Sequence, residues 1–381
     1  MRCVAIGSHT ARTQDIPIRQ WRLSRGSTQG IFPLATRAEA DLLRASAAAD
    51  LGARLKTQGF SPQLIIGHPG WGETILLAGV FPEAKQILHG EYFYKAEGAD
   101  VGFDPEFGSL DQDLRMSVIS KNAGLALAYV QADRIVCPTE FQASVFPRAL
   151  REQVSVIHEG VDTARVKRNP EAKLRLPGGL VLDRNTPVIT FINRNFEPLR
   201  GVHTFMRALP EFMAAVPDAH VIMIGADAGG YTGGRKDKPW RMAMLDELQG
   251  RLDLKRLHFP GRVPHNVMVE ALSVSTAHVY YTYPFVLSWS LLEAMACECL
   301  VLGSDTAPVR DAVTDGVDGR LLDFFDVQAL STAMIDACRS PKKYEAMRQA
   351  ARKTVLDRFD RSSLCEPAWM KLVDEVLEIG R

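Results

Sequence analysis

The sequence contains no long hydrophobic run. None of its apolar stretches approaches the roughly 18 uninterrupted apolar residues that suggest a membrane-spanning helix. The first residues, MRCVAIGSHTARTQ, also lack the apolar core of a secretory signal. We therefore expect a soluble, cytoplasmic protein, with a position at the inner face of the membrane as the remaining option.

Net charge and paired cysteines are also missing. The 381 residues include 45 basic and 45 acidic side chains, which gives a formal net charge of zero. This balance removes the bulk attraction to nucleic acids, so a few placed residues must hold any bound phosphate. The six cysteines are scattered and form no CxxC pair, which is typical of reduced thiols. The length predicts two domains.

Common nucleotide and metal motifs are absent too. The chain has no GxxxxGKS/T phosphate loop and no HExxH zinc motif. Glycines follow strand-like runs in GHPGWGE (67–73) and GADAGG (225–230), but neither stretch has the GxGxxG spacing of a dinucleotide site. A nicotinamide-dependent dehydrogenase is therefore disfavoured.

Short apolar runs alternate with helical patterns along the chain. The first series comprises LIIG (64–67), QILHG (86–90), RIVCP (134–138) and VSVIHEG (154–160), and the second VITFI (188–192), HVIMIGA (220–226), LHFPG (257–261), HVYYT (278–282) and CLVLGS (299–304). This alternation predicts an α/β protein with two doubly wound parallel sheets in tandem. The charged stretch at 162–187, rich in Pro and Gly, is interpreted as the interdomain linker. The last helical pattern carries on one face Trp369, Leu372, Val373, Val376 and Leu377.

Two stretches of the second series suit a phosphate. NRNFEPLRG (193–201) follows a strand and precedes a helical pattern, which places Arg194 and Arg200 beside a helix entrance. Two guanidiniums there would bind a pyrophosphate, although two solvated surface arginines explain the pattern equally well. In FVLSWSLLEAMA (285–296), Ser290 and Glu293 have the spacing of a capping box. Glu293 then either caps this helix or accepts hydrogen bonds from ribose hydroxyls.

Polar and aromatic residues follow two strands of the first series. His68 and Trp71 come after the run at 64–67, and His89 ends the run at 86–90. A lone histidine in such a place is usually structural or solvated. Histidines and aromatic rings at neighbouring strand ends also suit a sugar, whose apolar face stacks on rings while its hydroxyls form hydrogen bonds.

Taken together, these stretches resemble the retaining glycosyltransferases of family 4 over about half the chain. The similar stretches, in chain order, are ADRIVCPTEFQ (132–142), VSVIHEGVDTARV (154–166), ITFINRNFEPLRGVHTFMRALPEF (189–212), VIMIGA (221–226), HFPGRVPHNVMVEAL (258–272) and LLEAMACECLVLGSDTAPVRDAVTDGVDGRLL (291–322). The resemblance implies a GT-B fold, which has two facing Rossmann-like domains.

The resemblance also implies a domain layout. We expect an N-terminal acceptor domain at 1–165, a linker at 166–187 and a nucleotide-sugar domain at 188–355. A C-terminal helix at 356–381 is expected to pack back on the N-terminal domain. The family's first domain commonly opens with a strand, a turn and a long helix, whereas CVAIGS at residue 3 is similar to the second strand. We therefore expect the usual first strand and helix to be missing.

For the donor site, the resemblance assigns the diphosphate to Arg194 and to Arg200, which stands where the family usually has Lys. It assigns the ribose to Glu293. The family has another glutamate, the first of two in chain order, at the position of Phe285. Because phenylalanine accepts no hydroxyl hydrogen bond, the identity of the donor sugar stays undetermined. The other expected donor contacts are Asn193, Gly225, Val263, Ser288, Ser290, Leu291 and Leu292.

For the sugar and the acceptor, the resemblance assigns a catalytic role to His68, beside Arg194 and Arg200. Trp71, Gly72, His89 and Glu91 are the expected sugar or acceptor contacts. The family's reaction implies no metal ion and no other cofactor. The expected partners are a nucleotide sugar and a glycan, lipid-linked or small-molecule acceptor, without nucleic acid.

Two alternatives to this function stay open. A nucleotide-sugar epimerase shares the fold, and a degenerate binding protein would explain the lost glutamate at Phe285. A separate stretch with Arg19, Trp21, Arg22 and Arg25 suits a charged connector or a weak peripheral contact with an anionic membrane surface.

Overall fold

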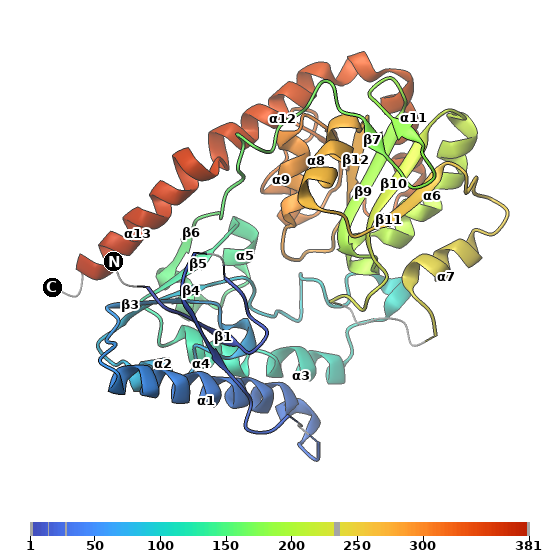
Figure 1. The fold of residues 1–381 in the computed structure, drawn as a ribbon. Helices are drawn as coiled ribbons and strands as arrows, with labels where there is room; N and C mark the ends of the chain where they lie inside the picture. Colours follow the sequence, from blue (N-terminus) through green and yellow to red (C-terminus); the bar gives the residue numbers. More distant parts are fainter. Residues whose placement is uncertain (1–2, 14, 27–28, 232–236, 379–381) are drawn as a thin grey trace. The chain divides into compact units, whose positions relative to one another are not determined.

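The computed structural model describes residues 3–13, 15–26, 29–231 and 237–378 (Figure 1). The chain divides into two compact units. The N-terminal unit runs up to His158 and takes in the chain again from Pro367, and the C-terminal unit spans Glu159–Glu366. Among the described helices, none combines the length and the apolar character needed to cross a membrane.

A six-stranded parallel sheet forms the centre of the C-terminal unit (Figure 1). In spatial order its strands are β11 (Leu257–Gly261), β10 (His220–Ala226), β9 (Val188–Asn195), β12 (Ala277–Tyr280), β13 (Leu300–Ser304) and β14 (Arg320–Leu322). The chain starts at β9, adds strands on one side, then returns to β12 and adds strands on the other. The doubly wound α/β architecture is therefore confirmed, and β9 and β12 flank the switch point where such sheets bind ligands.

The helices of this unit are α6 (Val202–Ala215), α7 (Trp240–Glu247), α8 (His265–Val274), α9 (Trp289–Ala296), α10 (Ala307–Arg310), α11 (Val327–Arg339) and α12 (Glu345–Arg358). Strand β9 is buried on both faces, from Val188 through Asn193, as expected of a central parallel strand. The ring of Phe191 stacks on Phe205 of α6, with 4.6 Å between centroids. Such packing fixes the strand ends that carry the candidate residues.

The N-terminal unit has a four-stranded parallel sheet with the order β3 (Leu64–Gly67), β4 (Lys85–His89), β5 (Arg134–Cys137) and β6 (Val154–Val156). Its helices are α1 (Thr36–Thr57), α2 (Leu77–Val80), α3 (Gln112–Ser120), α4 (Ala123–Tyr129) and α5 (Glu140–Ser144). Strands β1 (Ala5–Ser8) and β2 (Ile18–Trp21) form a separate parallel pair.

The last helix, α13 (Glu366–Glu378), belongs to the N-terminal unit although it is last in the sequence. Leu372, Val373 and Val376 are buried against Ile87 of β4 and Val136 of β5, with Trp369 and Leu377 packed at the margin. These are the residues that share one face in the helical pattern. The apolar stripe therefore covers the middle of the first sheet.

Two expectations are corrected by the packing. The stretch at 166–187 is no free linker, because Leu174 and Leu182 are buried in the core of the C-terminal unit. They lie on β7 (Leu174–Arg175) and β8 (Val181–Leu182), which form a short antiparallel pair. Sequence reasoning missed this pair because the stretch is rich in charged residues. Trp21 is 4% exposed and packs against Ala48 of α1, so its indole is not available to a membrane surface.

Candidate functional site

The carboxyl end of β9 presents the first group of candidate residues. Asn193 is buried, whereas Arg194 is exposed and makes no hydrogen bond or ion pair with the described residues. Gly225 of β10 lies against this strand end, since a Cβ there would sit 2.6 Å from the carbonyl oxygen of Asn193. Gly225 therefore allows the two backbones to approach closely, and Arg194 presents a guanidinium that none of the described acidic side chains neutralises.

Arg200 lies in the turn η5 (Pro198–Arg200) that leads into α6, and it is half-buried. Its Nη1 donates to Thr282 Oγ1 at 2.9 Å, to the carbonyl of Val286 at 2.9 Å and to Tyr280 Oη at 3.5 Å. Among the described residues, only Nη1 of this guanidinium forms hydrogen bonds. Arg200 therefore anchors the segment after β12 and keeps its other donors for a ligand.

Tyr280 links this segment to the next helix. Its buried hydroxyl accepts a hydrogen bond from the main-chain nitrogen of Ser288 at 2.6 Å. Burial raises the pKa of Tyr280, and the nearby charge of Arg200 only partly opposes this, so the phenol stays protonated. Sequence reasoning missed Tyr280 and Thr282, which read only as strand residues.

Phe285 is buried and packs against Tyr231, with 4.3 Å between ring centroids. The guanidinium carbon of Arg200 lies 5.6 Å from the centre of the Phe285 ring. The ring therefore offers the cation an aromatic face and no counter-charge.

Helix α9 starts next to these residues, but without the expected capping box. Ser288 is the N-cap residue, and the hydroxyl of Ser290 donates to the carbonyl of Ile192 on β9 instead of capping. Within the described chain, the amides of Trp289 and Ser290 make no hydrogen bond. Leu291 and Leu292 are fully buried, so they act by fixing the helix. The helix start thus offers donors and a positive dipole end to an anion.

Glu293 lies on the second turn of α9, with a side chain only 13% exposed. Its Oε1 accepts a hydrogen bond from His265 Nε2 at 2.6 Å, so His265 and not the helix start is its partner. Oε2 has no partner in the described part of the chain and stays available to a hydroxyl. Sequence reasoning missed His265; its signal is a polar residue that opens α8 just after β11.

Val263 follows β11 and is half-buried against the core. Its neighbour Arg262 donates from Nη2 to Asn195 Oδ1 at 3.2 Å, which ties the ends of β11 and β9 together. Arg262 is a further cation at this edge that the sequence pattern did not single out.

In the N-terminal unit, the expected meeting of two strand ends is confirmed. Strand β3 pairs with β4, and the rings of His68 and His89 stack with 5.3 Å between centroids. His68 Nδ1 accepts from the amide of Gly70 at 3.0 Å, so its proton resides on Nε2, which lies 3.2 Å from Glu91 Oε2. The Gly70 amide and Glu91 therefore fix the tautomer of His68 together.

Trp71 and Gly72 belong to the turn η2 (Pro69–Trp71) and its cap. Trp71 is 61% exposed and Arg37 lies over its ring, 5.6 Å from the centroid. Gly72 has a φ of 93°, and a Cβ there would sit 2.3 Å from the carbonyl oxygen of Asp41. Only glycine fits this left-handed contact.

The turn is attached to α1 through a buried carboxylate. Asp41 is 1% exposed and pairs with Arg37 Nε at 3.0 Å and Arg44 Nη2 at 2.7 Å. The two arginines in turn donate to the carbonyls of Gly70 and Trp71. Asp41 thus positions the loop that carries His68 and Trp71, and sequence reasoning missed it within a helical pattern.

Neither group of candidate residues brings together three histidine, cysteine or carboxylate ligands around one point among the described residues. Each group of residues can therefore bind a ligand through hydrogen bonds and charge. The C-terminal group is cationic and rich in free donors, whereas the N-terminal group combines an oriented imidazole with an exposed indole.

Comparison with known proteins gives these groups a context. Residues 1–166 match the "Glycosyl transferase family 4 group" and residues 176–354 match "Glycosyl transferases group 1". The GDP-mannose-dependent alpha-(1-6)-phosphatidylinositol monomannoside mannosyltransferase of Mycolicibacterium smegmatis is 25% identical over 60% of this chain and 59% of its own length. The D-inositol 3-phosphate glycosyltransferase of Thermobispora bispora is 26% identical over 58% of this chain and 51% of its own length. The matches thus span little more than half the length of these curated relatives.

Solved structures of other proteins have the same fold as this chain. Sucrose-phosphate synthase from Thermosynechococcus elongatus superposes with a TM-score of 0.71 at 16% identity, over 94% of this chain and 83% of that chain. Anabaena HepE in complex with UDP and glucose gives a TM-score of 0.65 at 17% identity, over 94% and 86% of the two chains. With the two family matches together covering nearly all of the sequence, the chain belongs to the family 4, group 1 glycosyltransferases and has their GT-B fold.

Proposed function

We propose that the protein transfers a sugar from a nucleotide-sugar donor to an acceptor with retention of anomeric configuration. One arrangement carries the proposal. The unpaired guanidinium of Arg194, the free donors of Arg200 and the open amides of α9 lie at the strand ends around the switch point of one sheet. This is a cationic, donor-rich place of the kind that binds a diphosphate.

The chemistry follows from where charge develops. As the bond from the sugar to the diphosphate breaks, negative charge grows on the leaving oxygen. Arg194, Arg200 and the amides of Trp289 and Ser290 stabilise that charge by electrostatic attraction, which is often the largest contribution to catalysis. No step of the proposed reaction is assigned to a metal ion. Glu293, held by His265, accepts hydrogen bonds from the ribose hydroxyls.

In the N-terminal unit, His68 is proposed to donate its Nε2 proton to an oxygen of the transferred sugar, in place of Glu91, when the sugar binds. Trp71 offers a flat apolar face, suited to a sugar ring. The acceptor is a glycan, a lipid-linked molecule or a small molecule. By their names, one relative above acts on a phosphatidylinositol monomannoside and the other on D-inositol 3-phosphate, so they support a lipid-linked and a small-molecule acceptor equally.

A thermal-shift screen tests the donor site first. UDP, GDP and ADP are added separately to the protein and to Arg194→Ala, with Arg251→Ala as the control for loss of an exposed arginine in the same unit. We expect one nucleotide to raise the melting temperature of the wild type and the control, but not of Arg194→Ala. No shift with any nucleotide would contradict the proposal.

The reaction itself is tested with the labelled sugar of the nucleotide that binds. Transfer to an added acceptor, with an unchanged anomeric configuration in the product by NMR, is the expected result. Conversion of the nucleotide sugar into an isomer without acceptor would instead identify an epimerase, an activity that none of the named relatives carries in its name.

A further inference from the structure

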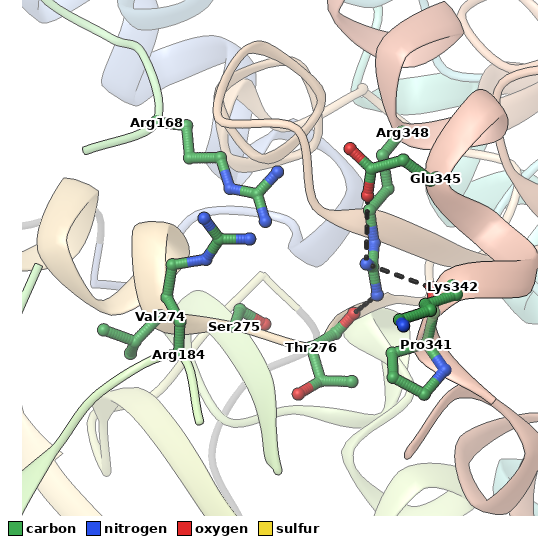
Figure 2. A pocket seen from close by; sticks show the side chains of 9 residues that line it. All are labelled: Arg168, Arg184, Val274, Ser275, Thr276, Pro341, Lys342, Glu345 and Arg348. Atoms are coloured by element: carbon green, nitrogen blue, oxygen red, sulfur yellow. Dashed lines mark hydrogen bonds and ion pairs between the residues drawn. The ribbon is translucent and has the colours of Figure 1, made fainter. Parts of the chain in front are cut away.

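A second cationic cavity lies at the opposite end of the sheet of the C-terminal unit. It has a volume of about 240 Å³ and is lined by Arg168, Arg184, Val274, Ser275, Thr276, Pro341, Lys342, Glu345 and Arg348 (Figure 2). Thr276 directly precedes β12, and its Oγ1 accepts from the amide of Val188 at the start of β9. By the rise of a parallel strand, β9 separates this cavity from the donor site by roughly 23 Å.

The lining carries an excess of positive charge. Four of its side chains are basic and only Glu345 is acidic. Glu298 pairs with Arg168 at 3.1 Å from outside the lining, so counting it still leaves two positive charges in excess, four minus two. Arg184 and Lys342 are exposed and make no hydrogen bond or ion pair within the described part of the chain. In Figure 2 the side chains of Arg168 and Arg184 extend from one side of the cavity and that of Arg348 from the other.

The guanidinium of Arg348 is buried with few partners, and burial of a charge is unfavourable for the stability of the protein without a ligand. Its side chain is 7% exposed, and its Nε is buried without a hydrogen-bond partner among the described residues. Its other nitrogens donate to the carbonyls of Thr276 at 2.8 Å and Pro341 at 3.3 Å, and Glu345 lies at 3.8 Å. Burial, and then the nearby charge of Arg168, lower the pKa of Arg348. Two carbonyl dipoles and one distant, half-exposed carboxylate are thus what offsets this buried charge.

We propose that this cavity binds a small phosphorylated anion through Arg168, Arg184, Lys342 and Arg348. The four cations come from three segments, namely the chain before β7, the loop before β9, and the turn η6 (Pro341–Tyr344) together with the first turns of α12. Guanidiniums bind phosphate oxygens through paired, charge-assisted hydrogen bonds, and the volume suits a phosphate or diphosphate group more than a nucleotide. The bound anion holds these three segments together and stabilises the C-terminal unit.

The site is tested by thermal shift and titration calorimetry with inorganic phosphate, pyrophosphate and glucose 6-phosphate. Sodium chloride at the same ionic strength is the reference, because it screens charge without occupying a phosphate site. We expect at least one of the three anions to raise the melting temperature above the chloride reference. The order of their affinities then distinguishes preference for a free phosphate from preference for a phosphorylated sugar.

Three variants separate this cavity from the donor site. Arg184→Glu changes an exposed side chain without a partner, and we expect it to weaken anion binding at least tenfold while sugar transfer stays unchanged. Arg251→Ala, the surface control, and Arg194→Ala, the donor-site variant, should retain the anion affinity. The proposal is overturned if none of the anions binds, or if their binding is lost in Arg194→Ala and retained in Arg184→Glu. If the nucleotide screen of the donor site fails, the anion-binding result can still be interpreted, because it involves no nucleotide.

Discussion

The two units hold their candidate residues in different ways. In the C-terminal unit, Arg200 and Ser290 bond to main-chain carbonyls of segments that extend from buried strands. In the N-terminal unit, the turn with Trp71 is attached to α1 by side chains that converge on the single carboxylate of Asp41. A sheet distributes positional order over many hydrogen bonds, whereas a salt-bridge network concentrates it in one residue. Single substitutions should therefore affect the two units differently.

The largest expected effect is on transfer rate. Arg194→Ala and Arg200→Ala should each lower kcat by about two to three orders of magnitude, as for other lost electrostatic stabilisers of a transition state. Only Arg200→Ala should also lower the melting temperature, because only Arg200 anchors Val286. Steady-state kinetics and calorimetry on both variants check this split. A double mutant with the wild-type rate would remove both residues from the site.

The second effect concerns stability of the N-terminal unit. Asp41→Asn leaves Arg37 and Arg44 without their buried counter-charge, and we expect a loss of about 2–3 kcal/mol in the free energy of unfolding, since both arginines are partly exposed. Urea unfolding measures it. Asp50→Asn, at an exposed position of the same helix, is the matched control and should be close to neutral. Equal losses in both variants would show that Asp41 does not act through the turn.

The third effect is a pH dependence in the C-terminal unit. Burial lowers the pKa of His278 to about 3, against an ordinary value of 6.5. The unfolded chain therefore binds a proton that the folded chain excludes at this residue, so the contribution of His278 to stability is fully present above pH 6.5 and falls by about 1.4 kcal/mol per pH unit below it, down to about pH 3.

Urea unfolding at pH 7, 5.5 and 4.5 checks this slope. His278→Asn keeps an acceptor near Thr190 but does not titrate, so its stability should fall less steeply than that of the wild type. His9→Asn, at an exposed position, should retain the wild-type slope. Identical slopes in the wild type and His278→Asn would assign the acid sensitivity to other groups.

A smaller effect is expected at the ribose. Glu293→Gln keeps one carbonyl acceptor but loses the charge that His265 and the hydroxyls share, so the KM for the donor should rise about tenfold with little change in kcat. Kinetics over a range of donor concentrations separates the two constants. A fall in kcat at unchanged KM would place Glu293 in the chemical step instead.

The smallest expected effect on the transfer rate is that of a substitution at Phe285. The same substitution is the most informative about specificity for the donor sugar. Phe285→Glu places a carboxylate beside Arg200, whose guanidinium now faces the ring. We expect an altered preference among nucleotide sugars, measured by competition between labelled donors. An unchanged donor profile would mean that position 285 does not lie beside the sugar.

The sequence predicted the strands of both sheets except β14, because runs such as VITFI and HVIMIGA are buried on both faces and leave no competing pattern. Strand β14 has only three residues, too few for a recognisable apolar run. It also placed Arg194 and Arg200 at a strand end. Asp41 and His265 escaped prediction for a physical reason, since both depend on contacts far away in sequence. His265 bonds to Glu293, and the two arginines that pair with Asp41 bond to the carbonyls of Gly70 and Trp71. The prediction of a capping box was wrong because the hydroxyl of Ser290 donates to the carbonyl of Ile192, a contact that exists only once the sheet has folded.

The position of α13 has a consequence for the order of synthesis. The C-terminal unit is one continuous stretch of chain, so it can fold as soon as Glu366 has left the ribosome. The N-terminal unit is made first but completed last, because Ile87 and Val136 stay uncovered until Leu372, Val373 and Val376 are translated. During that interval an apolar sheet face is open to solvent. A chaperone that acts on the nascent chain would therefore find its binding surface on the half of the protein made first.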